Sequence, residues 1–455
     1  MERKSTELPR QQLFTNKVLA KLMIPLFLET ALGVLVGMVD GVMVSSVGEA
    51  AISGVALVGN ISNVLVYVYA ALTTGGAVVT SHFLGAGKKE EARHSAGQLI
   101  TMTAAVSLGV MIFCLLFSRR MLRLLFGNIE QDVMEAAVTY FAYSSLSFPF
   151  MALRGAGAAI FRCNGDSKVS LYASMVTNLV NVAGNAICVY GLKMGVEGVA
   201  IPTLLSRIVG MAVIVGALMS KKQPLRPNLR DIFRLDPKII KRVARIGIPS
   251  GFESGLFHMG RVLTLSMISC FGTYQIAANS TANTLTSIVV IVPSTLINSS
   301  ITVIGQCVGA RDEAQVYQNF KKMMSWCYIF NGIAAVLLML LRYQFIGLYD
   351  SLAPETVELT STLMCIFLIP SILIYPLSFL VPGCLRATGD SAFPMWVSII
   401  SMLVFRLGLA QILCVNMGLG APGVWIAMVV DWAIRSVCFS WRWFRGGWKK
   451  KCGLE

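Results

Sequence analysis

The chain is built from long uninterrupted runs of apolar residues that are separated by short polar segments. A run of 18 or more apolar residues is long enough to cross a bilayer as a helix, whereas barrel strands would alternate apolar and polar positions. We therefore predict an all-α membrane protein with twelve transmembrane helices. They cover about residues 18–45, 52–80, 95–117, 136–161, 169–190, 196–219, 240–268, 276–304, 322–341, 357–383, 393–415 and 420–441.

The second half of the chain repeats the pattern of the first half at a nearly constant offset. IPLFLETALG begins at Ile24 and IPSGFESGLF at Ile248, and FRCNGDSK at Phe161 corresponds to LRATGDSA at Leu385. An even number of helices per unit gives both halves the same orientation in the membrane. We expect two six-helix lobes that are related by a pseudo-two-fold axis along the membrane normal.

The repeat also sets the expected domain boundaries. The N-terminal lobe covers residues 1–220, the linker covers residues 221–238, and the C-terminal lobe covers residues 239–455. The linker is charged and rich in proline, which is typical of a segment in water and not of a span.

Composition and charge place the protein more closely. Apolar residues make up 55% of the chain and charged residues 13%, against roughly 25% charged residues in soluble domains. The net charge is +15, and the basic residues gather in alternate loops, which marks the cytoplasmic side. We expect a multi-pass protein of the inner (plasma) membrane with cytoplasmic termini and linker, and with 48–50 and Lys193 outside. These bases flank membrane spans without a recognition motif, so nucleic acid is not an expected partner.

Enzyme, cofactor and metal chemistry find little support in the sequence. The eleven cysteines are scattered singly, without the spacing of a metal site or a disulfide framework. A phosphate-binding G-x-x-x-x-G-K-[ST] motif is missing from the sequence. We expect a protein that is not an enzyme and has no cofactor, and an ion gradient would drive any transport.

Asp40 is the strongest candidate for chemistry within the spans. Ionisable residues are costly in hydrocarbon, and Asp40 stands in VGMVDGVMV with no base within one helical turn. Its counterpart in the second half is Thr264, so this acid breaks the symmetry of the repeat. Burial favours the protonated form of a carboxyl group, which suits proton coupling, although a cation site would use the same residue. The alternative is an aspartate that bonds to a neighbouring helix for packing.

The fifth span carries Asn178, Asn181 and Asn185 at spacings of three and four, so they share one helix face. Three amides on one face suit a cation site or a hydrogen-bonded contact between helices, and the sequence leaves both open. Pro25 removes a backbone hydrogen bond in the first span and provides a place for a kink.

Further ionisable residues in the spans are candidates for a gate or a substrate contact. Glu29 and Glu253 are equivalent in the repeat, and paired features of this kind indicate architecture. Asp431 precedes Arg435 by four residues, which favours a local ion pair. The remaining candidates are His258 and Arg261, where His258 or water would bridge Glu253 to Arg261.

These motifs resemble the multidrug and toxic compound extrusion (MATE) family, with its DinF-like and NorM-like members, within the superfamily that includes lipid and polysaccharide flippases. The resemblance covers essentially the whole chain. It implies a monomeric antiporter that exports amphipathic, often cationic drugs in exchange for H+ or Na+, within membrane lipids. It also implies a coupling role for Asp40 and a cation-site wall at Asn181, Asn185 and Thr203. Relatives with a sodium site often have aspartate at the position of Asn185, so we favour H+ over Na+ at Asp40, Asn181 and Asn185.

Two other functions remain open from the sequence. A flippase of a lipid-linked precursor would need a strongly cationic cavity. Only Arg154, Arg207, Arg261, Arg406 and Arg435 would supply it. A channel or a non-transporting membrane receptor is the third reading, since sequence alone does not distinguish a cleft from a pore.

Overall fold

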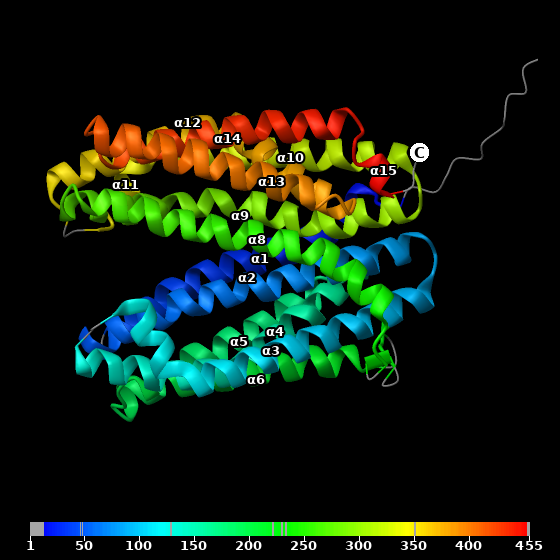
Figure 1. The fold of residues 1–455 in the computed structure, drawn as a ribbon, viewed down its shortest axis with the longest axis horizontal. Helices are drawn as coiled ribbons and strands as arrows, with labels where there is room; N and C mark the ends of the chain where they lie inside the picture. The colour runs from blue at the N-terminus through cyan, green and yellow to red at the C-terminus, as the bar shows by residue number, and fades with distance from the viewer. Residues whose placement is uncertain are drawn as a thin grey trace, which may run out of the picture.

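The fold is a pair of helix bundles that lie side by side (Figure 1). The computed structural model describes residues 13–452 except 46, 48, 128–129, 221–222, 229–230, 233 and 350–351. Every regular element among these described residues is a helix. The predicted all-helical fold is therefore confirmed.

Six helical rods form the first bundle, and six more form the second. The first contains α1 (Asn16–Ser45), α2 (Glu49–Gly85), α3 (Lys89–Phe126), α4 (Gln131–Cys163), α5 (Lys168–Asn185) continued by η1 (Ala186–Gly191), and α6 (Glu197–Leu218). The second contains α8 (Pro237–Ser269), α9 (Thr273–Gly309), α10 (Glu313–Leu340), α12 (Pro354–Ala387), α13 (Ala392–Ser401) continued by η2 (Met402–Gly408) and η3 (Gln411–Asn416), and α14 (Ala421–Phe444). The short helices α11 (Arg342–Ile346) and α15 (Lys449–Cys452) complete the described elements.

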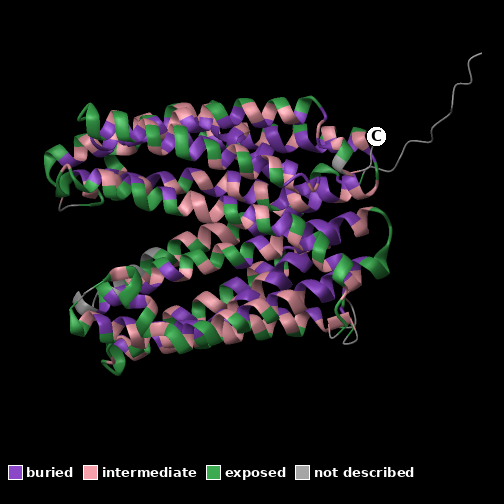
Figure 2. Cartoon of the chain, viewed as in Figure 1, coloured by how far each residue is buried: buried purple, intermediate pink, exposed green. Residues whose placement is uncertain are grey.

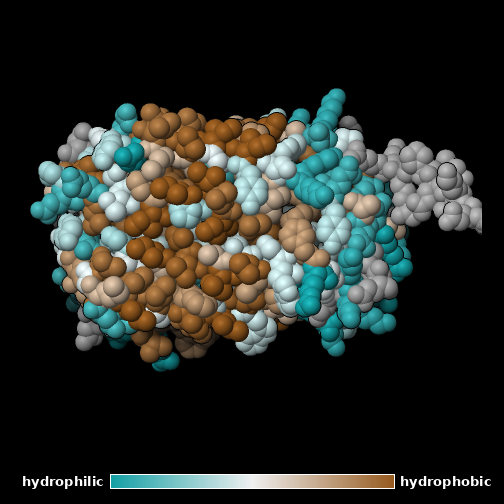
Figure 3. All heavy atoms as spheres, turned by 90° about the horizontal axis from the view of Figure 1, so that it is seen from above, coloured by the Kyte–Doolittle hydropathy of each residue, from teal (hydrophilic) through white to brown (hydrophobic). Residues whose placement is uncertain are grey.

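Each of the twelve predicted spans falls on one of these rods. Ten helical segments among the described residues are long and apolar enough to cross a membrane, and α5 and α8 are not among them. A multi-pass membrane protein is confirmed, whereas the count of twelve crossings stays a prediction. One face of the molecule carries a broad apolar band with hydrophilic side chains toward its ends (Figure 3).

The internal repeat is visible in the positions of the elements. Helices α2 and α9 have 37 residues each, and they begin and end at equivalent positions of the sequence repeat. The π-helical segments η1 and η3 have 6 residues each and are equivalent in the same way. A π-helical turn requires a local departure from the usual hydrogen-bond ladder, so its recurrence at equivalent positions is a strong sign of duplication.

The two bundles meet where α2 crosses α9. A β-carbon added at Gly85 would collide with the backbone carbonyl of Gln306, and one added at Gly309 would collide with that of His82. His82 Nε2 donates to Ala387 O at 2.7 Å, and Gln306 Nε2 donates to Cys163 O at 2.6 Å. These contacts are symmetric, because in the sequence repeat His82 is equivalent to Gln306, Gly85 to Gly309 and Cys163 to Ala387. We call His82, Gly85, Cys163, Gln306, Gly309 and Ala387 the interlobe junction.

The bundles separate away from the interlobe junction. Figure 2 shows buried residues concentrated where the bundles meet and more exposed residues along the facing helices at the other end. There, Tyr67 of α2 and His258 of α8 line a common cavity of about 390 Å³. Both ends of the described chain lie near the junction, since Leu13 N donates to Gln315 Oε1 and Cys452 Sγ donates to Thr388 O.

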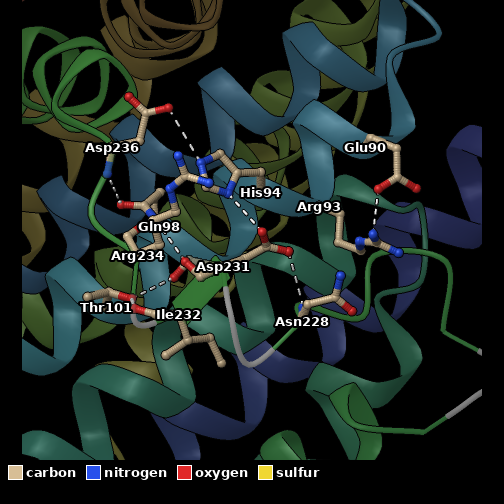
Figure 4. A network of polar contacts seen from close by, with 11 residues as sticks. Glu90, Arg93, His94, Gln98, Thr101, Asn228, Asp231, Ile232, Arg234 and Asp236 are labelled. Carbon is tan, nitrogen blue, oxygen red and sulfur yellow. Dashed lines mark hydrogen bonds and ion pairs between the residues drawn. The ribbon is translucent and has the colours of Figure 1, made fainter.

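The described part of the linker is fixed to α3 by a polar network (Figure 4). His94 lies between two carboxylates, with Nδ1 3.0 Å from Asp231 Oδ1 and Nε2 3.4 Å from Asp236 Oδ2. Gln98 Nε2 donates to the backbone carbonyls of Asp231 and Arg234, and its oxygen accepts from the backbone N–H of Asp236. The connection between the two bundles is therefore held against the first bundle and does not form a free tether.

A side chain at Gly309 is predicted to destabilise the interlobe junction. In Gly309→Val the new side chain would meet backbone and not a flexible side chain, so we expect a loss on the order of 1–3 kcal/mol. Gly216→Val is the matched control, because it places the same residue in a helix where no atom lies within 4 Å. Thermal unfolding in detergent measures both variants, and equal melting temperatures would contradict the contact.

The orientation is tested by cysteine labelling. We expect that Arg226→Cys, in the linker, is protected from a membrane-impermeant maleimide in intact cells, while Lys193→Cys is labelled. Both side chains are exposed, so lack of access would reflect the membrane and not burial. Gly48, also expected outside, lies beyond the described residues. The native cysteines are first replaced by serine, and labelling of position 226 after permeabilisation is the control. Labelling of position 226 in intact cells would reverse the predicted topology.

Candidate functional site

Asp40 lies at the meeting point of α1, α5 and α6. Asn185 Nδ2 donates to Asp40 Oδ1 at 3.2 Å. With its amide nitrogen turned toward the carboxylate, Asn181 donates to both oxygens of Asp40 at 3.0 and 3.1 Å, and its oxygen accepts from Thr203 Oγ1 at 3.3 Å. We call Asp40, Asn181, Asn185 and Thr203 the Asp40 site. The structure thus brings together four of the five predicted coupling residues.

Local structure explains this arrangement. Asn181 and Asn185 are one helical turn apart on the face of α5 that packs against α1, and both are buried. The helix changes to the π-helical segment η1 directly after Asn185. Departures of this kind are frequent at functional sites. The amides therefore belong to an interior polar site of the first bundle and not to a lipid-facing surface.

Asn178 does not join the Asp40 site. Its Nδ2 is buried, and no hydrogen-bond partner for it occurs among the described residues. Asn185 Oδ1 is likewise buried without a partner in the described part of the chain. The shared helix face of the three asparagines was predicted correctly, but contact with the carboxylate extends to only two of them.

The Asp40 site offers one carboxylate and two amide groups to a cation. Hard cations take several converging oxygen ligands. Asn185 donates to the Asp40 carboxylate, and Asn181 does so as well in the amide orientation that satisfies its hydrogen bonds, so among the described residues the site is arranged as a hydrogen-bonded carboxyl group. No cluster of three or more His, Cys, Asp or Glu able to hold a metal occurs within the described residues.

Glu29 occupies the same face of α1 as Asp40. Its Oε2 accepts from Ser170 Oγ of α5 at 2.7 Å. Eleven residues of helix place the two carboxylates about 16 Å apart along the axis. Pro25 lies within α1, which continues through it as helix. A bending role for Pro25 therefore stays a prediction.

The first bundle has the single acid Asp40 at its site, whereas the second bundle contains a largely buried group of acidic and basic side chains. Glu253 Oε2 pairs with Arg386 at 2.8 Å, and its Oε1 accepts from Ser398 at 2.9 Å and lies 3.8 Å from Arg435. Asp431 Oδ2 lies 3.8 Å from both Arg435 and Arg406. We call Glu253, Arg386, Arg406, Asp431 and Arg435 the C-lobe charge cluster.

The cluster confirms one predicted pair and corrects another. Asp431 and Arg435 form the expected i,i+4 pair on α14. Glu253, however, pairs with Arg386 and Arg435, so the proposed bridge to Arg261 through His258 is not formed. His258 and Arg261 instead line a cavity between the bundles. The sequence missed Arg386 and the pairing of Arg406 because their partners lie on other helices, beyond the reach of a spacing rule.

Basic side chains line four cavities among the described residues, of about 320 to 390 Å³ each. Arg154 and Arg162 line the first, and Arg261 and Arg406 line both the third and the fourth. The second lies beside the interlobe junction and is lined by Lys88 together with further bases. No described aspartate or glutamate lines any of these four cavities. An electrically positive interior of this kind disfavours a cationic ligand.

Relatives of known sequence match nearly the whole length of the chain. An uncharacterized transporter of Bacillus subtilis (strain 168), YisQ, is 25% identical over 434 residues, which cover 94% of each protein. A probable multidrug resistance protein of Thermotoga maritima, NorM, is 25% identical over 450 residues, which cover 96% of this chain and 94% of the relative. A solved structure of an outward-facing multidrug resistance MATE family transporter has a TM-score of 0.88 at 22% identity, covering 95% of this chain and 96% of its own.

A family model, described as MatE, matches the chain twice, over residues 25–187 and 249–412. The two matches begin and end at equivalent positions of the internal repeat. Together they cover well over half of the chain. This protein therefore belongs to the MatE family, the MATE transporters, and consists of two copies of the family's repeating unit.

Proposed function

We propose that this protein is a secondary active efflux transporter that exports amphipathic small molecules in exchange for protons by alternating access. Family membership supports transport, and the NorM relative is named a probable multidrug resistance protein. The observation that carries the coupling is the Asp40 site: one carboxyl group held by two amides, with Thr264 at the equivalent position of the second bundle.

Protonation of Asp40 changes the hydrogen bonds that Asn181 and Asn185 make with it. An ionised carboxylate only accepts hydrogen bonds, so it satisfies the donors of Asn181 and Asn185. A protonated carboxyl group carries its own O–H donor and offers fewer acceptor positions to these amides. Uptake of a proton therefore weakens the connection between α1 and α5. Pro25 gives α1 a place to bend when that connection changes.

The described state fits the outward-open half of the cycle. The interlobe junction closes the end that carries the termini and the linker, which we expect to be the cytoplasmic end because basic residues gather in its loops. Asp40 is near the opposite end of α1, where outside protons would reach it. In this scheme substrate is released when Asp40 takes a proton from outside, and the protein resets when the proton leaves inside.

Helix α1 also connects the Asp40 site to a cavity. Thr30 and Val34 of α1 line the cavity that contains Arg261 and Arg406 of the second bundle. A bend of α1 would therefore change the wall of that cavity. Proton uptake at Asp40 would in this way change the affinity of the cavity for a substrate.

A flippase of a lipid-linked precursor is the second candidate. Such a protein needs a cationic cavity, and three of the five arginines named for this purpose, Arg154, Arg261 and Arg406, line cavities. The two candidates differ in cargo and not in the coupling residue. The closed interlobe junction argues against a simple channel.

Asp40→Asn is predicted to fold but to abolish gradient-driven export, because an amide does not cycle between charged and neutral forms. Asp40→Glu should retain part of the activity. Asp132→Asn, an exposed substitution of the same chemistry near the start of α4, is the matched control. Export of ethidium and of fluorescein from liposomes with a pH gradient measures all three. Activity of Asp40→Asn equal to wild type would move the coupling role to Glu29 or Asp431.

Export is predicted to be indifferent to sodium. The amides at the Asp40 site present nitrogen to the carboxylate, so a sodium gradient should add nothing at a fixed pH gradient. Replacement of sodium by choline on both sides of the liposome should leave the initial rate unchanged. Loss of transport in choline would instead support Na+ at Asp40, Asn181 and Asn185.

A further inference from the structure

Two adjoining cavities between the bundles, lined mainly by the second bundle, share part of their lining. They measure about 320 and 390 Å³. Both are lined by Arg261, Asn283, Arg406 and Met428, so we treat them together as the C-lobe cavity. Volumes of this order suit small organic ligands.

Arg406 is a buried guanidinium with unused donors. Its exposed fraction is 5%, and neither Nε nor Nη1 has a hydrogen-bond partner among the described residues. The nearest carboxylate oxygen, Asp431 Oδ2, is 3.8 Å from Nη1, well beyond the reach of a charge-assisted hydrogen bond. Asp431 Oδ1 already accepts from Ser401 at 2.5 Å. Arg406 is thus a buried positive charge whose nearest carboxylate compensates it only at a distance, and an anion in the cavity would be attracted to it.

The charged residues that line the C-lobe cavity are basic: Arg406, the one member of the C-lobe charge cluster in its lining, and Arg261. The C-lobe charge cluster contains three guanidinium groups and two carboxylates, which leaves one positive charge in excess. Arg261 adds a second positive charge on the cavity wall. An anion would therefore bind in a favourable potential, and a cation would not.

Aromatic side chains line the same cavity as the arginines. Tyr375 and Phe379 stack with ring centroids 4.1 Å apart, and Trp432 meets Tyr375 edge-on at 5.1 Å. Arg406 lies 4.7 Å from the ring centroid of Phe257. Arg435 lies 5.2 Å from that of Phe379. The rings of Phe257 and Phe379, which would attract an organic cation, already lie beside guanidinium groups of the protein itself.

We propose that the C-lobe cavity binds amphipathic organic anions, with Arg406 and Arg261 holding the acidic group and the aromatic wall holding a flat apolar body. The inference rests on the proposed export function and names its substrate class: carboxylates, sulfonates or phosphates that carry an aromatic or lipid-like group. It differs from the organic cations that the sequence resemblance implies.

A pair of probes with the same ring and opposite charge tests the proposal. Naphthalene-2-sulfonate and trimethyl(2-naphthyl)ammonium are titrated calorimetrically into the full chain in nanodiscs of phosphatidylcholine. We expect the sulfonate to bind at least about tenfold more tightly than the ammonium compound, the size of effect expected for one charged contact. Tighter binding of the ammonium compound would overturn the proposal.

Substitutions of Arg406 and Arg261 test whether the sulfonate binds in the C-lobe cavity. Arg406→Gln and Arg261→Gln should each weaken sulfonate binding about tenfold, and Arg406→Lys should retain part of it because the charge remains. Arg261 is exposed in the cavity, so its variant tests the site even where a change at buried Arg406 disturbs folding. Arg445→Gln, beside Trp441 and outside the cavity, is the matched control. Unchanged binding in folded Arg261→Gln and Arg406→Gln would also overturn the proposal.

A further titration with an anionic lipid shows whether the bound anion is a lipid headgroup or a soluble molecule. Phosphatidylglycerol is added to the nanodiscs and the sulfonate titration is repeated. Competition would assign the site to an anionic lipid headgroup, and unchanged affinity would assign it to soluble anions. Binding is measured without a gradient, so its failure leaves proton-driven export standing. Failure of export in wild-type liposomes likewise leaves the binding result standing.

Discussion

The contact of backbone against backbone between α2 and α9 is the constraint on which the rest of the structure depends. Gly85 and Gly309 allow the two helices to meet with no side chain between them. His82 and Gln306 then donate to the last carbonyls of α12 and α4, which a helix end leaves without an internal partner. Such groups are costly in a membrane when unpaired. Because each half makes equivalent contacts to the other, the junction holds the two lobes together at one end. At the other end the lobes are apart, and cavities lie between them.

Symmetry of the scaffold contrasts with asymmetry of the chemistry. The first lobe has one carboxyl group, Asp40, between two amides, and no charged partner for it occurs among the described residues. The second lobe has Thr264 at the equivalent position and a cluster of arginines and carboxylates elsewhere. Duplication therefore supplied two frames of similar shape, and substitutions gave them different interior chemistry. The arrangement favours ion coupling in the first lobe and ligand binding in the second.

The fold was predictable from the sequence because its signals are local. Apolar runs longer than a bilayer, and one motif repeated about halfway along the chain, are enough to place all the long helices and the duplication. Asp40, Asn181 and Asn185 could also be predicted as site residues, because helical spacing and the lack of a nearby base can be read from neighbouring positions in the sequence. The C-lobe charge cluster was not, since Glu253 meets Arg386 only after α8 and α12 pack together. The charge of the cavity walls likewise depends on which face of each helix turns inward.

Helix α1 is the element that joins these parts. One face carries Glu29 and Asp40 against α5, and Thr30 and Val34 reach the C-lobe cavity. A ligand shifts a conformational equilibrium only by its different affinity for the two states, and the same limit applies to a proton. Movement of α1 would alter the donors around Asp40 and the wall beside Arg406 together. Proton and anion would then bind to opposite conformations of one helix, which is the physical requirement for exchange of one against the other.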